Sequence, residues 1–148
     1  MRLLLAALLL ALAGCSSSPS SASPDPVVAP DSWLGMPPGD ARAFHGPGGK
    51  LILIAVDETY AIDGTNASAV TWELGDHYTT DYWVQADDGT VQWYGRRGSW
   101  RAGRQGEEPR DVPIVDGTAT FGDRTITVGD DGPTQLETPD GVYEPSGG

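Results

Sequence analysis

Apolar residues after residue 31 fall in short runs separated by Gly, Pro and Asp, and no window shows the period of a capped helix. This pattern predicts an all-β domain, a small antiparallel curved sheet in the form of an open barrel or a sandwich. The continuous run 51–56 predicts a central strand covered on both faces. The other predicted strands are 69–74, 80–86, 90–94, 112–115, 118–121, 124–128 and, near the C-terminus, 142–143.

A turn signal at Asp87-Asp88-Gly89 predicts the register of one hairpin. These residues fit a three-residue loop in which Gly89 adopts a positive φ, a conformation that glycine reaches without steric cost. The resulting register places Trp83 opposite Trp93 on one face and Tyr82 opposite Tyr94 on the other. Each face of the hairpin is therefore predicted to hold an aromatic pair.

Two further turn signals follow in the C-terminal half. Asp116-Gly117 fits a type I′ turn and Gly122-Asp123 fits a type II′ turn. We therefore expect residues 112–128 to form a three-stranded meander, ended by the pair Asp130-Asp131.

The first 15 residues have the order of a bacterial lipoprotein signal. Arg2 precedes the apolar stretch 3–12, and Leu12-Ala13-Gly14-Cys15 reads as a lipobox. Ten apolar residues rise only about 15 Å as a helix, half of the roughly 30 Å hydrocarbon core, so a permanent transmembrane helix is disfavoured. We expect cleavage of residues 1–14 and lipidation of Cys15, and the alternative is an ordinary signal peptide with a chance cysteine.

Composition divides the rest of the chain into a linker and one domain. Residues 16–30 are almost all Ser, Pro and Ala, and they are predicted to be a disordered linker that reaches roughly 45 Å when extended. Residues 31–144 are predicted to be the β domain, and 145–148 a disordered tail. The domain is then expected to be anchored in the cell membrane by lipid and to face the extracytoplasmic side.

Charge excludes one class of partner. The chain has 9 Lys and Arg against 21 Asp and Glu, a formal net charge of −12. Such a surface repels nucleic acid at long range, so nucleic-acid binding is not expected. Cys15 is the only cysteine, which leaves none for a disulfide or a thiolate metal site once it carries lipid.

Candidate catalytic and metal-ligating residues form no recognisable set. The two histidines, His45 and His77, have no zinc-ligand spacing, and the acidic pairs lack the alternation of a calcium loop. Asp76-His77 with Asp81 offers three ligands, although a polar hairpin end is the simpler interpretation. No nucleophile with a base and an orienting group is evident, so we expect neither metal, cofactor nor catalysis.

A local concentration of cations stands out in this acidic chain, because five of the nine Lys and Arg residues lie in 93–110. Guanidinium groups have the geometry to bind phosphate or carboxylate, and aromatic rings nearby would provide stacking surfaces, so this segment is a candidate binding site. The alternative, which strand patterning favours, is that Trp93 and Trp100 anchor the core while the arginines pair with neighbouring acids. The predicted binding patch comprises Trp93, Tyr94, Arg96, Arg97, Trp100, Arg101 and Arg104.

Several short motifs within residues 50–104 occur together. They are V-D-E-T at 56–59, D-Y-W-V-Q at 81–85, G-T-V at 89–91, Tyr94-Gly95 and G-S-W-R-A-G at 98–103. With this spacing the chain resembles an uncharacterised domain of exported bacterial proteins, many of them actinobacterial lipoproteins. The resemblance implies an exported β domain and transfers neither an activity nor site residues. Many relatives carry an acidic residue where this chain has Arg96-Arg97, so no shared partner is implied.

These observations lead to one functional expectation and two alternatives. We expect a membrane-anchored, non-catalytic lipoprotein that binds an envelope protein or an anionic glycan through a sheet face or the arginine-rich loop. One alternative is a carrier of a lipid or other apolar ligand, and the other is an envelope hydrolase. A carrier would show an apolar pocket beyond what a packed core needs, whereas an interaction module would show a packed interior and an exposed patch.

Overall fold

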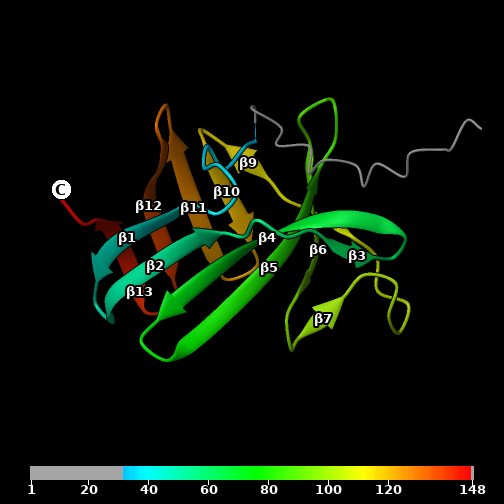
Figure 1. Cartoon of the computed structure of the whole chain (residues 1–148), viewed down its shortest axis with the longest axis horizontal. Coiled ribbons are helices and arrows are strands. Elements are labelled where there is room, and N and C mark those ends of the chain that lie inside the picture. Colours follow the sequence, from blue (N-terminus) through cyan, green and yellow to red (C-terminus); the bar gives the residue numbers. More distant parts are fainter. Residues whose placement is uncertain (1–31, 148) are drawn as a thin grey trace, which may run out of the picture.

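The computed structural model describes residues 32–147, which contain thirteen strands joined by turns and loops (Figure 1). The predicted signal peptide 1–14, the lipidation site Cys15 and the linker 16–30 lie outside these residues. No helix occurs in the described part, which confirms the all-β prediction, and hence no helix there has the length and hydropathy to cross a membrane. The strands are β1 (Ala41–Gly46), β2 (Gly49–Ala55), β3 (Tyr60–Ile62), β4 (Thr65–Leu74), β5 (His77–Gln85), β6 (Val91–Arg96), β7 (Trp100–Arg101), β8 (Arg110–Asp111), β9 (Ile114–Val115), β10 (Thr118–Phe121), β11 (Arg124–Gly129), β12 (Gly132–Thr138) and β13 (Gly141–Pro145).

The strands form one antiparallel sheet that curves into an open half-barrel. Their order is β7-β6-β5-β4-β2-β1-β13-β12-β11-β10-β9, with β3 paired to β4 and β8 paired to β6. In Figure 1, strands β1, β2, β4 and β5 pass in front of β10, β11 and β12. The sheet thus folds over on itself, as predicted, and its inner face encloses the core.

The main core draws large apolar side chains from both halves of the sheet. Phe44 and Leu53 from β1 and β2 lie with Phe121, Ile126 and Tyr143 from the C-terminal strands, and all five are fully buried. Alternation along each strand produces this arrangement, because successive side chains point to opposite faces. Packing between the N-terminal and C-terminal strands therefore holds the two halves of the curved sheet against each other.

Strand β2 is central, as expected, but its two faces differ in burial. Leu51, Leu53 and Ala55 are buried, whereas Ile52 and Ile54 on the outer face are only half-buried. The prediction that both faces are covered is therefore wrong for this strand. Strands β4 to β6 are the ones that carry a second core on their outer face, composed of Ile62, Ala67, Ala69, Tyr82, Tyr94 and Ala102.

Segment 110–115 spans the open side of the half-barrel. At its start β8 pairs with β6, and the Val112 amide donates a hydrogen bond to the Val91 carbonyl, 2.9 Å away. At its end β9 pairs with β10, and the Thr120 amide donates to the Pro113 carbonyl at 3.2 Å. This one segment therefore ties the two ends of the sheet together through backbone hydrogen bonds.

The hairpin of β5 and β6 follows the predicted register for its first three pairs. Trp83 pairs with Trp93, and the loop closes with Gly89 at a φ of 88°. Beyond this point Tyr82 pairs with Gly95, because Tyr94 is an extra residue that forms a β-bulge. The predicted pairing of Tyr82 with Tyr94 is therefore wrong, although both rings belong to the outer core.

The predicted meander is confirmed. Asp116 and Gly117 both have positive φ values, 50° and 76°, as a type I′ turn requires, and Gly122 has a φ of 62°, as at the first position of a type II′ turn. Strands β9, β10 and β11 follow one another in the sheet.

The C-terminal prediction needs correction. Pro145 ends strand β13 and pairs with Phe44, and the Ser146 amide donates to the Ala43 carbonyl at 2.9 Å. The predicted disordered tail from residue 145 is therefore wrong for Pro145 and Ser146. Strand β12, directly after the pair Asp130-Asp131, was not predicted either, although it connects β11 to β13.

Candidate functional site

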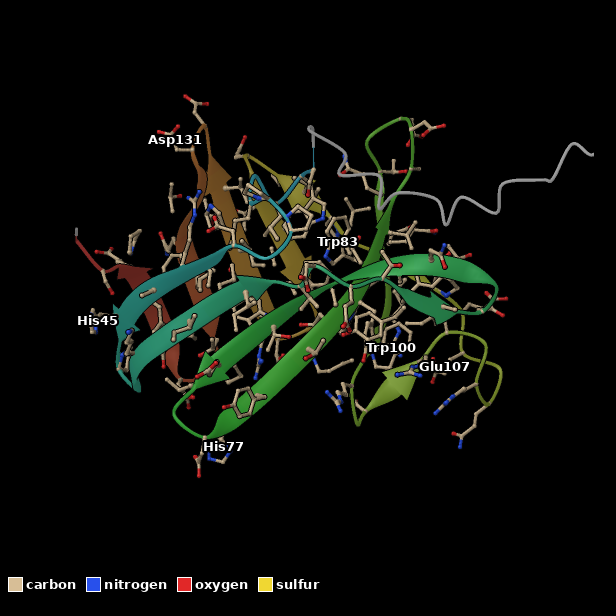
Figure 2. All side chains as sticks on the ribbon, viewed as in Figure 1. His45, His77, Trp83, Trp100, Glu107 and Asp131 are labelled. Carbon is tan, nitrogen blue, oxygen red and sulfur yellow. The ribbon has the colours of Figure 1, made fainter. Side chains whose placement is uncertain are left out.

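A depression of about 260 Å³ forms at the turn between β6 and β7. Figure 2 shows Trp100 at β7 and Glu107 in the loop that follows. Trp100 and four arginines of the predicted patch line the depression together, although they come from different elements: Arg96, Arg97, Arg101 and Arg104. The fold therefore brings most of the predicted patch to one place.

Two members of the predicted patch do not reach this surface. Trp93 is 6% exposed and belongs to the main core, and Tyr94 is 9% exposed and belongs to the outer core. Neighbouring residues on a strand point to opposite faces, which separates these two rings. Trp100 contacts the Trp93 ring edge-on at a centroid distance of 4.9 Å, so the depression rests on a buried aromatic floor.

Arg96 is held by buried and neighbouring groups and is the least available of the four cations. Its Nε donates to Asp81 Oδ1 at 2.8 Å, and its Nη1 donates to Asp123 Oδ1 at 2.8 Å. Its Nη2 donates to the Phe121 carbonyl at 3.1 Å and to Asp81 Oδ2 at 3.3 Å. Arg96 thus links β5 and β6 to the β10–β11 turn and serves mainly the fold.

Asp81 is the buried centre of this network, with no exposed surface. The indole nitrogens of Trp72 and Trp93 each donate to one of its oxygens at 3.1 Å. Burial raises the pKa of the Asp81 carboxyl above its ordinary value, and the hydrogen bonds from Arg96 and Trp72 oppose that rise. Asp123 lies at the exposed end of this hydrogen-bond network, and the hydrogen bond from Arg96 lowers the pKa of its carboxyl.

The guanidinium groups of the other arginines at the depression have fewer partners within the protein than that of Arg96. Arg97 and Arg104 are exposed, and half-buried Arg101 has its guanidinium carbon 5.2 Å from the centre of the Tyr82 ring. Outside the depression's lining, Arg110 stacks on Trp100 at 3.9 Å and pairs with Glu107 at 3.2 Å. Arg97, Arg101 and Arg104 are therefore the groups with donors to offer to a ligand.

The chemistry of this set suits an anion. Guanidinium forks match the geometry of carboxylate and phosphate oxygens, and their charge is permanent. Glu107 also lines the depression, and its ion pair with Arg110 neutralises part of the negative charge that it would otherwise present to Arg97, Arg101 and Arg104. The arrangement contains groups for binding and orienting an anionic group.

The other candidate residues lie apart from this depression. His77 and Asp76 are exposed at the end of the β4–β5 hairpin (Figure 2), whereas Asp81 is buried further along β5. His45 is exposed on β1. Within residues 32–147 no three His, Cys, Asp or Glu side chains are grouped to hold a metal ion. The acidic pairs at 57–58, 87–88 and 130–131 are exposed at loops.

Sequence reasoning missed the role of Asp81. The signal was present, because a strand over 80–86 places Asp81, Trp83 and Gln85 on one face, and the Trp83–Trp93 pair marks that face as the core. Arg96 could not be assigned to Asp81 from the sequence, because the predicted register places it on the opposite face.

No family model, curated protein or solved structure matches this chain. The resemblance to exported bacterial domains therefore stays a prediction.

Proposed function

We propose that this protein is a membrane-anchored, non-catalytic binding module of the bacterial cell envelope. In this proposal Cys15 carries the lipid anchor, and the depression at the β6–β7 turn binds a phosphate or carboxylate group of an anionic envelope glycan. The observation that carries the proposal is the convergence of Arg97, Arg101 and Arg104 around Trp100.

The net charge of the chain limits the length and charge density of the glycan that it can bind. The chain as a whole is strongly acidic, with a formal net charge of −12, so a long polyanion is repelled over most of its length. At physiological salt, electrostatic interactions between exposed charges are largely screened beyond about 8 Å. Repulsion from distant carboxylates is therefore weak at the depression, and the three neighbouring arginines attract a single anionic group. A short or sparsely charged glycan fits this combination better than a dense polyanion.

The test is a titration of the full-length chain with glycerol 3-phosphate and with glucuronate, followed by the NMR signals of the Trp100 indole and the arginine Nε–H groups. We expect saturable shifts that weaken as salt is added. The variant Arg97→Gln/Arg101→Gln/Arg104→Gln should lose them, whereas Lys50→Gln, which removes an exposed cation from β2, should not. Absence of binding by either anion, or equal binding by the triple variant, would reject the proposal.

The anchor requires a separate test. Metabolic labelling with a radioactive fatty acid should label the intact chain, and Cys15→Ser should abolish the label and release the domain from membranes. A Cys15→Ser protein that stays membrane-bound after signal cleavage would contradict lipid anchoring at this residue.

A further inference from the structure

A second hollow lies where segment 32–38 crosses strands β2, β4 and β5. It is a groove of about 460 Å³, within the range of small-molecule sites, and none of its described lining residues belongs to the arginine depression. Figure 2 places Trp83 near this crossing and Trp100 at β7. The two hollows are therefore separate features of the molecule.

The segment that forms one wall of the groove is firmly attached. Leu34 and Met36 are 1% and 4% exposed and belong to the main core. The Trp33 amide donates to Gln85 Oε1 at 2.9 Å, which fastens the segment to β5. Core packing and this hydrogen bond hold the wall of the groove in place. The site is therefore largely formed before a ligand binds.

Among the described residues, the indole nitrogens of Trp33, Trp83 and Trp100 are buried without a hydrogen-bond partner, and Trp83 is the one of these residues that lines the groove. Trp83 lines the groove and is 7% exposed, and its indole Nε1 is buried without a hydrogen-bond acceptor among the described residues. The neighbouring Trp33 ring meets it edge-on at 5.4 Å and supplies apolar contact. A buried donor without an acceptor is unfavourable and marks a place where an oxygen atom would be stabilised.

The remaining lining specifies the chemistry of the occupant. Leu34, Met36 and Ala55 supply apolar surface, while Asn66 and Ser68 supply amide and hydroxyl groups. Among the described lining residues there is no Lys, Arg or His, whereas Asp87 is present, so an anionic ligand is disfavoured. A lipid acyl chain fits poorly as well, because it would leave the polar groups without partners.

We propose that this groove binds a small uncharged molecule that has an apolar body and hydroxyl or ether oxygens. The Trp83 ring shifts on binding, so that its Nε1, which neighbouring side chains cover in the described structure, donates a hydrogen bond to one of these oxygens. Hydroxyl-bearing parts then lie toward Asn66 and Ser68. This site does not depend on the arginine depression, so either proposal can fail while the other stands.

The test uses the five tryptophan indole signals of the full-length chain, labelled with ¹⁵N. Phenyl β-D-glucoside serves as the uncharged probe, and phenyl phosphate serves as an anionic probe with the same ring. We expect the glucoside to shift the Trp83 indole signal saturably and to leave that of Trp100 in place. Phenyl phosphate should leave the Trp83 signal unchanged.

Variants locate the binding. Trp83→Phe keeps a ring but removes the donor, and it should weaken binding by about two- to tenfold, as measured by calorimetry. Ser68→Leu fills the groove and should abolish binding, and exposed Asn66→Leu gives the same test if the half-buried position 68 does not tolerate leucine. Ser99→Leu, at an exposed turn position that lines the arginine depression and not this groove, is the matched control and should bind the glucoside normally.

Three results would overturn the proposal. The first is the absence of a saturable Trp83 shift, which would mean that water alone occupies the groove. The second is undiminished binding by both groove-filling variants. The third is equal binding of phenyl phosphate at Trp83.

Discussion

Arg96 and Asp81 pair inside the half-barrel because β6 carries one extra residue, Tyr94, before Gly95. A regular ladder would place Arg96 opposite Thr80 on the outer face. The bulge shifts the register by one residue and turns the Arg96 side chain inward, where its Nε lies 2.8 Å from Asp81 Oδ1.

Gly95→Ala should disrupt the bulge. Gly95 has a φ of 146°, and an added Cβ would lie 2.5 Å from the Trp100 carbonyl oxygen. We expect a loss of more than about 2 kcal/mol in the free energy of unfolding, since backbone strain of this kind costs about 1–3 kcal/mol before any clash. Urea unfolding measures it. Gly98→Ala, also at positive φ but in open space, should cost less, and an equal cost would contradict the role of the bulge.

Asp81→Asn should leave the Arg96 guanidinium partly buried without its carboxylate. Removing one partner of a buried pair costs about 3–5 kcal/mol, because the remaining charge loses its compensation. Adding Arg96→Gln to this variant should recover part of the loss, as determined by a double-mutant cycle in urea. Additive effects of the two substitutions would show that the pair does not act as a unit.

The pH dependence of stability should reveal the contact between Arg96 and Asp123. Arg96 lowers the pKa of Asp123 in the folded state, so the carboxylate stabilises the fold above its unfolded pKa, and this contribution is lost as the pH falls through the folded pKa. The side chain is 55% exposed, so the contribution is at most about 1 kcal/mol. The stability difference between the native chain and Asp123→Asn, measured at pH 6 and again at strongly acidic pH, should shrink on acidification. A difference that grows would contradict this assignment.

Asp116 tests the type I′ turn that joins β9 to β10. Its φ of 50° lies in the left-handed region, which Asp and Gly tolerate and β-branched residues do not. Asp116→Gly should change the unfolding temperature little, whereas Asp116→Val should lower stability by about 1–2 kcal/mol. Thermal unfolding monitored by circular dichroism distinguishes the two variants, and equal stability would mean that the turn type is not what this position requires.

The arginine patch illustrates how far sequence reasoning reaches. Five cations in one short segment are visible without any structure, and the hairpin signal at Asp87-Asp88-Gly89 predicts the pairing of Trp83 with Trp93 correctly. The role of each cation depends on the face of the strand that carries it. One extra residue in β6 changed that face for Arg96, and the sequence contains no strong signal for it.

The groove at Trp83 was not predicted at all, and the reason is similar. Its lining comes from residues 32–38 and from strands that are separated from them by up to about fifty positions. No local pattern records that a loop without regular structure will pack across the strands through Leu34 and Met36. Sites made from distant segments appear only once the chain is folded.

By itself the sequence determined the class of fold, the turns at 87–89, 116–117 and 122–123, and the strands of the meander, because each depends on the periodicity or φ preferences of adjacent residues. Tertiary structure alone decided which half of the sheet meets the other, that Asp81 is buried against Arg96, and that segment 110–115 spans the opening. These features depend on packing between residues far apart in the chain, and local preferences carry no information about such contacts.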